Sequence, residues 1–206
     1  MTAAVPVSGL SLPVLAETLP GARLRDAAAI GGAALLTAVL AQVAIPVAGS
    51  PVPITGQTLA VVVTAAALGP ARGVSAQLLY LALGLVGLPF YSEATHGVEV
   101  VVGATGGYLL AFPLAAYVIG TAARHGQDRQ VRRAVPLFLA GQLLIFAVGV
   151  PWLAVVADLS ATQALHAGFF PFLVGGLVKA VLAGLLLPGL WRAAPSSGAG
   201  VSRVGR

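Results

Sequence analysis

One lysine, Lys179, offers the clearest chemistry in this chain of 206 residues. It lies in the apolar run 171–191, where no other side chain carries a charge. A charged group inside such a run usually faces a cavity or a partner. Three interpretations are open: Lys179 binds a ligand, it forms an ion pair with Asp158 or Glu99, or the boundaries of the run are misplaced. We expect the first.

The position of Lys179 along its run indicates how deeply the ammonium lies. If a helix begins at Pro171, Lys179 follows eight residues later, roughly 12 Å along the axis. An ammonium at that depth in a bilayer costs at least about 2.5 kcal/mol. A lysine side chain of about 6 Å is too short to reach the outer surface from there. The sequence therefore predicts a cavity near mid-membrane around Lys179.

The chain lacks the arrangements on which nucleotide and metal-dependent hydrolysis depend. A phosphate-binding loop places its lysine between glycine and serine or threonine, whereas Lys179 lies between two apolar residues. His96, His125 and His166 are far apart and show no His-Glu-x-x-His spacing. There is no cysteine, so thiolate sites are excluded. We expect neither a metal nor a cofactor.

Two further segments match enzyme motifs only in part. Residues 73–77 read Gly-Val-Ser-Ala-Gln, which misses the last glycine of the Gly-x-Ser-x-Gly nucleophile elbow. Residues 103–107 read Gly-Ala-Thr-Gly-Gly, without the strand-turn-helix unit of a dinucleotide fingerprint. An intramembrane transferase would need an acidic or histidine pair near mid-membrane, which the apolar runs lack. We therefore predict that the protein is not an enzyme.

Uncharged polar residues inside the apolar runs are further candidates for ligand contacts. Gln77 and Tyr80 are three residues apart and share one helix face, and Gln57 lies near the start of another run. Taken alone, each of the three more often joins helices than contacts a ligand. Both roles remain open.

A pair of glycines begins the fourth apolar run, beside a predicted outer loop. The segment reads Thr105, Gly106, Gly107, Tyr108. Two glycines at a helix start leave backbone amides open to a bound ligand. Close packing of two helices is the alternative, and the sequence does not choose between them.

Helices that span a membrane must position these residues. Apolar side chains make up 58% of the chain and charged ones 8%, and the mean hydropathy is +0.98. Soluble domains carry about a quarter charged residues. The apolar runs are long and unbroken, whereas the strands of membrane barrels alternate. The predicted fold class is therefore an all-α integral membrane protein.

The apolar runs predict a bundle of six transmembrane helices. They are 26–45, 54–68, 73–88, 105–123, 134–158 and 171–191. The second and third hold 15 and 16 residues, which is short for a hydrocarbon core of about 30 Å. We divide the chain into a cytoplasmic segment 1–25, a membrane domain 26–192 and a disordered cytoplasmic tail 193–206.

The arginines predict the orientation of the bundle. With both termini in the cytoplasm, all ten arginines lie on that side, so the net charge of +5 reflects topology and not a nucleic-acid partner. The outer loops are then 46–53, 89–104 and 159–170. The longest holds the β-branched run 98–102, which could form a short strand or a lid on the bundle mouth. A plain connector is the alternative.

The first apolar run carries two rows of small residues at four-residue spacing. One row is Ala29, Ala33, Thr37 and Ala41, and the other is Ala34 and Ala38. Small residues let helix backbones approach closely in a membrane. The rows either pack against the protein's own helices or dock a partner protein.

Several short segments, taken in order, form a recognisable set. They are 51–55 (Pro-Val-Pro-Ile-Thr), 57–60 (Gln-Thr-Leu-Ala), 68–70 (Leu-Gly-Pro), 77–81 (Gln-Leu-Leu-Tyr-Leu), 87–89 (Gly-Leu-Pro), Gly103, 105–109 (Thr-Gly-Gly-Tyr-Leu) and Lys179. Together they resemble the BioY family, the biotin-binding S components of energy-coupling factor (ECF) vitamin transporters. The resemblance covers roughly residues 23–192.

The resemblance implies a six-helix S component of a bacterial cytoplasmic membrane, with its pocket toward the outer side. It implies biotin as the ligand, and a transmembrane coupling (T) protein with two ABC-type ATPase subunits as partners. S components carry an Ala-x-x-x-Ala pattern on the first helix for the coupling protein. Ala29 with Ala33 and Ala34 with Ala38 both fit that pattern.

One position departs from the family pattern. The family typically has an aspartate three residues before the pocket lysine, and here that position is Gly176. Its hydrogen bonds must come from elsewhere, or the ligand is held differently. The expected binding residues are Lys179, Gln77, Tyr80, Thr105, Gly106, Gly107, Tyr108, Gln57 and Gly176. Which end of biotin meets Lys179 stays open, and another small vitamin is the alternative ligand.

Overall fold

The structure is a computed structural model that describes residues 13–18 and 22–193. Apart from Ala193, the predicted tail 193–206 lies outside the described residues, as does most of the predicted segment 1–25. The elements are η1 (Leu15–Thr18), α1 (Ala22–Ala41), β1 (Ala44–Ile45), β2 (Ile54–Thr55), α2 (Gln57–Leu68), α3 (Pro70–Leu85), η2 (Ser92–Ala94), α4 (Val98–Val102), α5 (Gly106–Arg124), α6 (Val131–Val156), α7 (Ala161–Gly168) and α8 (Phe172–Ala193).

Each of the six predicted apolar runs corresponds to one helix. The largest shift is at the first run, because α1 begins and ends four residues earlier than predicted, at Ala22 and Ala41. The second run begins later than predicted, because Ile54 and Thr55 pair with Ile45 and Ala44 as a short antiparallel hairpin before α2 begins. Within the described residues, α1, α5, α6 and α8 are long and apolar enough to cross a membrane. Helix α2, with 12 residues, is only about 18 Å long. A mostly helical membrane fold is confirmed, and crossing by α2 and α3 and the orientation of the termini stay predictions.

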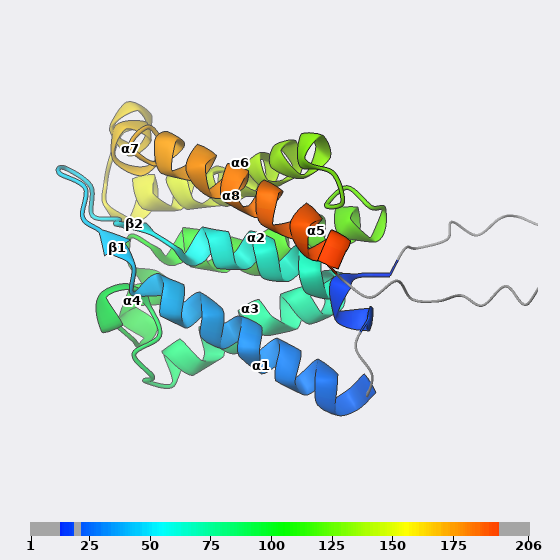
Figure 1. Ribbon diagram of the computed structural model, residues 1–206. Helices are drawn as coiled ribbons and strands as arrows, with labels where there is room; N and C mark the ends of the chain where they lie inside the picture. The colour runs from blue at the N-terminus through cyan, green and yellow to red at the C-terminus, as the bar shows by residue number, and fades with distance from the viewer. Residues whose placement is uncertain (1–12, 19–21, 194–206) are drawn as a thin grey trace, which may run out of the picture.

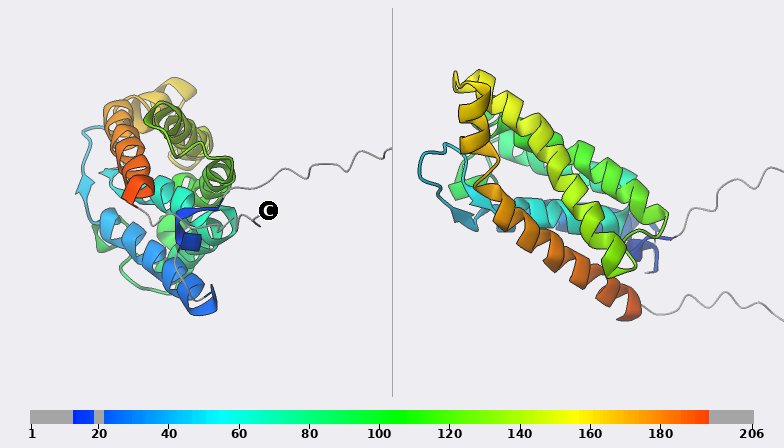
Figure 2. Two further views of the ribbon diagram at one scale, coloured as in Figure 1. Left: turned by 45° about the vertical axis from the view of Figure 1, so that its right-hand side comes forward. Right: turned by 90° about the horizontal axis from the view of Figure 1, so that it is seen from above.

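The helices lie along a common direction, and both ends of the described chain lie at the same end of the bundle (Figure 1 and Figure 2). Helix α2 is central and packs against α1, α3, α5 and α8. Close approach between helices depends on small residues. At Gly120 on α5, for example, a Cβ would lie 2.5 Å from the backbone nitrogen of Pro70 at the start of α3, so only glycine allows this contact.

The arginines lie together at one end of the bundle, as the sequence predicts. Arginines lie near the start of α3, at the end of α5, at the start of α6 and at the end of α8, all at the end where the chain termini lie (Figure 1). The hairpin, η2, α4 and α7 lie at the opposite end, which carries Glu93, Glu99 and Asp158. We call these the arginine end and the hairpin end.

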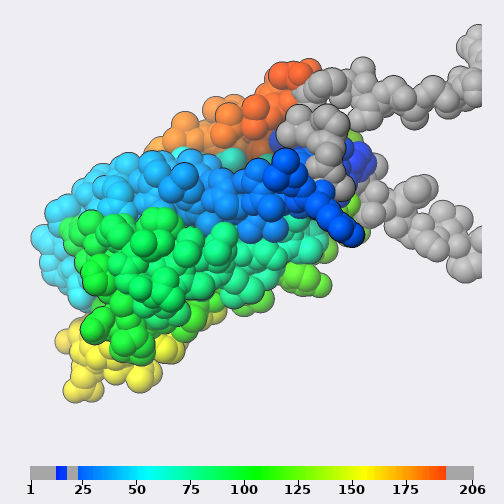
Figure 3. All heavy atoms as spheres, turned by 90° about the horizontal axis from the view of Figure 1, so that it is seen from below, coloured from blue at the N-terminus to red at the C-terminus, as the bar shows by residue number. Residues whose placement is uncertain are grey.

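The small-residue rows of α1 lie largely inside the bundle. Ala33, Ala34 and Ala38 are 5%, 0% and 4% exposed, because α1 packs against α2 and α3. The outward face of α1 instead presents Gly32 and Leu35 and runs uncovered along one side of the molecule (Figure 3). Of the two roles open for these rows, the structure supports internal packing for Ala33, Ala34 and Ala38.

Half of the longest predicted outer loop, 89–104, is helical. It contains η2 and α4, so the short strand, one of the possibilities open for 98–102, does not form. A strand needs a neighbour for its backbone hydrogen bonds, and among the described residues β1 and β2 pair only with each other. The segment therefore satisfies its backbone groups locally, as a helical turn bounded by Gly97 and Gly103.

Glu17 fastens η1 to the arginine end. Its carboxylate accepts hydrogen bonds from Arg124 Nη2 at 2.7 Å and from Arg72 Nη1 at 3.2 Å, which joins α5 to α3. Burial alone would raise the pKa of Glu17, but the hydrogen bonds from the two arginines outweigh burial and hold the pKa below its usual value. The folded protein therefore favours the charged form.

Replacing Glu17 with glutamine is expected to lower the thermal unfolding midpoint in detergent by several degrees. A hydrogen bond to a charged group contributes about 1.5–3 kcal/mol, and 1 kcal/mol corresponds to about 2–4 °C in a chain of this size. Glu99→Gln, at an exposed carboxylate of the hairpin end, is the matched control. Folding lowers the pKa of Glu17, so its charged form stabilises the folded protein. The difference in unfolding midpoint between the wild type and Glu17→Gln should therefore be full above about pH 4.3 and vanish as the pH falls further. Equal midpoints for both variants at pH 7 would refute this.

Candidate ligand-binding site

A cavity opens at the hairpin end, between α2, α5, α6 and α8. It encloses about 570 Å³ of space free of protein atoms, its open mouth included. Residues from the hairpin, η2 and α4 complete its rim.

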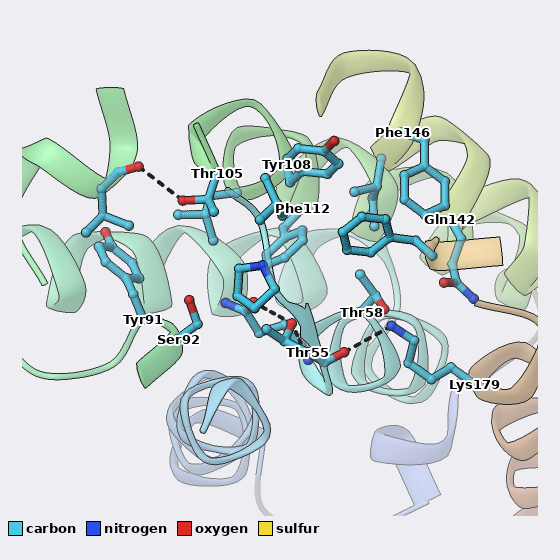
Figure 4. A pocket seen from close by; sticks show the side chains of 17 residues that line it. Thr55, Thr58, Tyr91, Ser92, Thr105, Tyr108, Phe112, Gln142, Phe146 and Lys179 are labelled. Atoms are coloured by element: carbon cyan, nitrogen blue, oxygen red, sulfur yellow. Dashed lines mark hydrogen bonds between the residues drawn. The ribbon is translucent and has the colours of Figure 1, made fainter. Parts of the chain in front are cut away.

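Lys179 lies on the wall of this cavity, about two turns into α8. Its Nζ donates a hydrogen bond to the backbone oxygen of Thr55 at 3.0 Å, at the junction between β2 and α2 (Figure 4). None of the ion pairs within the described residues involves Lys179. The structure therefore supports the cavity interpretation and does not show the ion pair with Asp158 or Glu99.

A chain of hydrogen bonds continues from the junction toward α3. The hydroxyl of Thr55 donates to Gln57 Oε1 at 2.7 Å, and Gln57 Nε2 donates to the hydroxyl oxygen of Tyr80 at 2.6 Å. Tyr80 is fully buried and does not line the cavity. Gln57 thus faces the cavity with its orientation fixed from behind by Tyr80.

Aromatic side chains form much of the remaining wall. Tyr108 and Phe112 come from α5, Phe146 from α6 and Phe172 from α8. Phe146 packs edge-on against Tyr108, with ring centroids 6.3 Å apart. The Tyr108 hydroxyl donates to the backbone oxygen of Gly168 at 2.9 Å, so it is already used inside the protein. The cavity therefore combines a large apolar surface with a few polar groups.

Two polar groups on the cavity wall are buried and unpaired. Gln142 Oε1 and Thr58 Oγ1 have no hydrogen-bond partner among the described residues. Gln142 Nε2, in contrast, donates to the backbone oxygen of Gly176 at 2.6 Å. Unpaired buried acceptors cost free energy, and a polar ligand in the cavity could satisfy them.

Tyr91, in the segment 89–104, forms part of the rim. It is fully buried, and its hydroxyl donates to the backbone oxygen of Leu81 at 2.7 Å. Gln42, near the end of α1, holds the same segment: its Nε2 donates to the Tyr91 backbone oxygen at 3.0 Å, and its Oε1 accepts from the Ala94 backbone nitrogen at 2.9 Å. These contacts fix the segment at the rim of the cavity, and its role as a lid stays a prediction.

The predicted glycine pair lies away from the cavity. A Cβ on Gly107 would meet the side chain of Trp152, and one on Gly106 would meet the backbone oxygen of Val101. The Gly106 amide donates to the backbone oxygen of Gly103 at 3.1 Å. The structure thus uses both glycines for close packing of α5 against α6 and α4.

The predicted site residues divide into three groups. Four line the cavity: Lys179, Gln57, Thr105 and Tyr108. Tyr80 and Gly176 lie behind lining residues, in contact with Gln57 and Gln142. Gln77 lies between α3 and α1, where its Nε2 donates to the Thr37 hydroxyl at 3.4 Å, and Gly106 and Gly107 also lie off the cavity.

Sequence reasoning missed several lining residues. Gln142 and Thr58 are visible in the sequence as polar residues inside apolar runs, but nothing there indicates that they face the same space as Lys179. The inward positions of Phe112 and Phe146 follow from helix rotation, which apolar runs of almost uniform composition do not reveal. Within residues 13–18 and 22–193, no group of His, Cys, Asp and Glu side chains could hold a metal ion.

Known proteins of one family are similar to this chain over most of its length. The model of the BioY family matches residues 11–196. Biotin transporter BioY2 of Lactococcus lactis subsp. cremoris (strain MG1363) is 39% identical over 154 residues, which cover 73% of this chain and 81% of that protein. Biotin transporter BioY of Thermotoga maritima is 37% identical over 151 residues, covering 73% and 86%.

A solved structure shares the fold. It is the crystal structure at 2.1 Å of the S-component for biotin from an ECF-type ABC transporter. The TM-score is 0.76, the sequence identity 23%, and the match covers 82% of this chain and 92% of the other.

Proposed function

Because the chain belongs to the BioY family, we propose that it is the membrane-embedded biotin-binding component of an uptake system. The observation that carries the proposal is the cavity with one ammonium, two unpaired polar atoms and an aromatic wall. Biotin has an apolar ring sulfur and valeryl chain, a ureido group and a carboxylate, which suit such a lining. Another small vitamin is the competing ligand.

The protein binds its ligand without converting it, since the family is one of transporters and not of enzymes. The ligand enters at the hairpin end, where the cavity opens, and Lys179 with Gln57 and Thr105 contacts it. Tyr80 and Gly176 act through the lining residues that they hold. Energy comes from partners: a transmembrane coupling protein and two ABC-type ATPase subunits.

Helix α1 docks the coupling protein in this proposal. Its outward face is uncovered along the length of the bundle (Figure 3), and Gly32 has no atom within 4 Å of the position of a Cβ. Ala29 lies partly buried at the edge of this face. Ala33, Ala34 and Ala38 contribute indirectly, by setting how closely α1 packs on its own bundle.

We further propose six membrane spans in a bacterial cytoplasmic membrane, with both termini and the arginine end in the cytoplasm. The distribution of arginines supports this orientation. Since the chain lacks cysteine, single cysteines can be introduced cleanly. In intact cells, a membrane-impermeant thiol reagent is expected to label Ser92→Cys from outside, and Ser197→Cys only after the cells are opened. The reverse pattern would overturn the topology.

Uptake of labelled biotin by cells that lack their own biotin transporter tests the function. Cells that express this chain with its coupling protein and ATPases are expected to accumulate biotin, and an ATPase-inactive variant should abolish that accumulation. Uptake of thiamin but not of biotin by the same cells would refute biotin as the ligand.

A further inference from the structure

The amide of Gln142 is held in one orientation by the backbone of α8. Its Nε2 donates to the Gly176 backbone oxygen at 2.6 Å. In the reversed orientation two oxygens would face each other at that distance, which is repulsive because neither carries a hydrogen. With the nitrogen turned to Gly176, the atom left over is the carbonyl oxygen. Gln142 therefore has an unpaired acceptor, Oε1.

Glycine at position 176 leaves the space that this amide occupies. A Cβ on Gly176 would lie 3.1 Å from Gln142 Oε1, closer than ordinary van der Waals contact. Any larger residue at position 176 would have to displace the amide. Gln142 and Gly176 thus form a matched pair on facing helices, with the polar group supplied by α6 and the space by α8.

The free oxygen of Gln142 needs a hydrogen-bond donor. The side chain is 3% exposed, and its Oε1 has no partner among the described residues. Both Gln142 and Lys179 line the cavity, and Figure 4 shows them at the same end of it, away from Ser92 and Thr105. Gly176, which Gln142 contacts, lies three residues before Lys179 on the same face of α8. The acceptor and the donor therefore belong to the same part of the cavity wall.

We propose that Gln142 determines specificity by accepting a hydrogen bond from a ureido N–H of biotin, while Lys179 donates to the ureido oxygen. This inference rests on the proposed function. Adjacent acceptor and donor groups match the adjacent N–H and C=O of a cyclic urea. A carboxylate has no hydrogen to donate, and its charge would face the free oxygen of Gln142. The carboxylate of biotin therefore lies at the other end, toward Ser92 and Thr105.

Calorimetric titration of purified Gln142→Leu with biotin tests this assignment. Leucine retains the bulk of the side chain but has no acceptor, and at least tenfold weaker binding is expected. Biotin methylated on the ureido nitrogen that Gln142 contacts should bind weakly to the wild type, and Gln142→Leu should discriminate against it less. Esterifying the carboxyl group should cost both proteins the same factor, because Gln142 does not contact that end.

A swap of the acceptor between the two helices separates binding from folding. Gly176→Asp alone is expected to weaken biotin binding at least tenfold, because the new side chain collides with the amide of Gln142. Combining Gly176→Asp with Gln142→Ala frees that space and returns an acceptor to the same place. The double variant should bind biotin more tightly than either single variant, a coupling that independent damage at two sites would not produce.

The outcomes distinguish this inference from the proposed function. If the wild type binds no biotin, the proposed function fails. A second outcome is that the wild type binds biotin and Gln142→Leu binds it with the same affinity. If the two proteins also discriminate equally between biotin and both N-methylated forms, the role of Gln142 is overturned. Loss of binding in Gln142→Leu without rescue by the double variant would also overturn it, provided that both proteins elute as monodisperse species.

Discussion

Replacing Lys179 with alanine is expected to weaken biotin binding at least tenfold, about 1.4 kcal/mol, while the protein still inserts and purifies. The ammonium is the one charged group among the described residues that line the cavity. Removing a charged hydrogen-bond donor from a buried site usually costs this much or more. Calorimetric titration of the purified variant measures the loss directly.

Lys179 also donates to the Thr55 backbone oxygen, so a control must separate binding from support of the hairpin. Lys179→Met keeps the length and packing of the side chain but not its charge, and it should lose as much affinity as Lys179→Ala. Arg192→Ala, at an exposed residue of the same helix at the arginine end, should bind biotin normally. An unchanged dissociation constant in Lys179→Ala would show that the ammonium does not contact the ligand.

A tryptophan at Gly32 is expected to abolish assembly with the coupling protein and ATP-driven uptake, while biotin binding stays intact. Gly32 is exposed on α1, and no atom of the described residues lies within 4 Å of the position that its Cβ would take. Ala34→Trp is the matched contrast, since Ala34 is fully buried. Overpacking there typically costs about 1–3 kcal/mol, so this variant should lose stability and biotin binding together.

Pull-down of the coupling protein and biotin titration of the same preparations separate these two effects. Ala28 is another exposed residue of α1, and Ala28→Trp serves as a second outward substitution in case the partner does not contact Gly32. Normal assembly and uptake in both outward variants would exclude the uncovered face of α1 as the docking surface. Intact folding and binding in Ala34→Trp would contradict the internal packing of that row.

The sequence predicts the positions of the helices because the hydrophobic effect in a membrane acts on whole segments. Six apolar runs separated by turn-forming or charged residues leave little choice of helix positions, and the structure has a helix at each. Lys179 is equally predictable as a cavity residue, because an isolated charge in an apolar run is costly unless it faces a cavity or a partner. The grouping of the arginines at one end of the bundle was predictable for the same reason, because it depends only on the order of the apolar runs along the chain.

Details that depend on helix rotation and on contacts between segments could not be predicted. Small residues occur on more than one face of α1, as Ala34 and Gly32 show. Only the packing of α1 on α2 and α3 decides which of these faces is buried. The run 98–102 is β-branched, but the strand that it suggests has no partner at the hairpin end. The orientation of the Gln142 amide depends on its contact with Gly176, which lies on another helix.

The most direct test of the central claim is calorimetric titration of the purified wild-type protein with biotin, thiamin and riboflavin in parallel. We expect tight binding of biotin alone, at one site per chain, because the cavity places a lysine donor, a glutamine acceptor and an aromatic wall around one ligand. Tight binding of thiamin or riboflavin in place of biotin, or of none of the three, would contradict it.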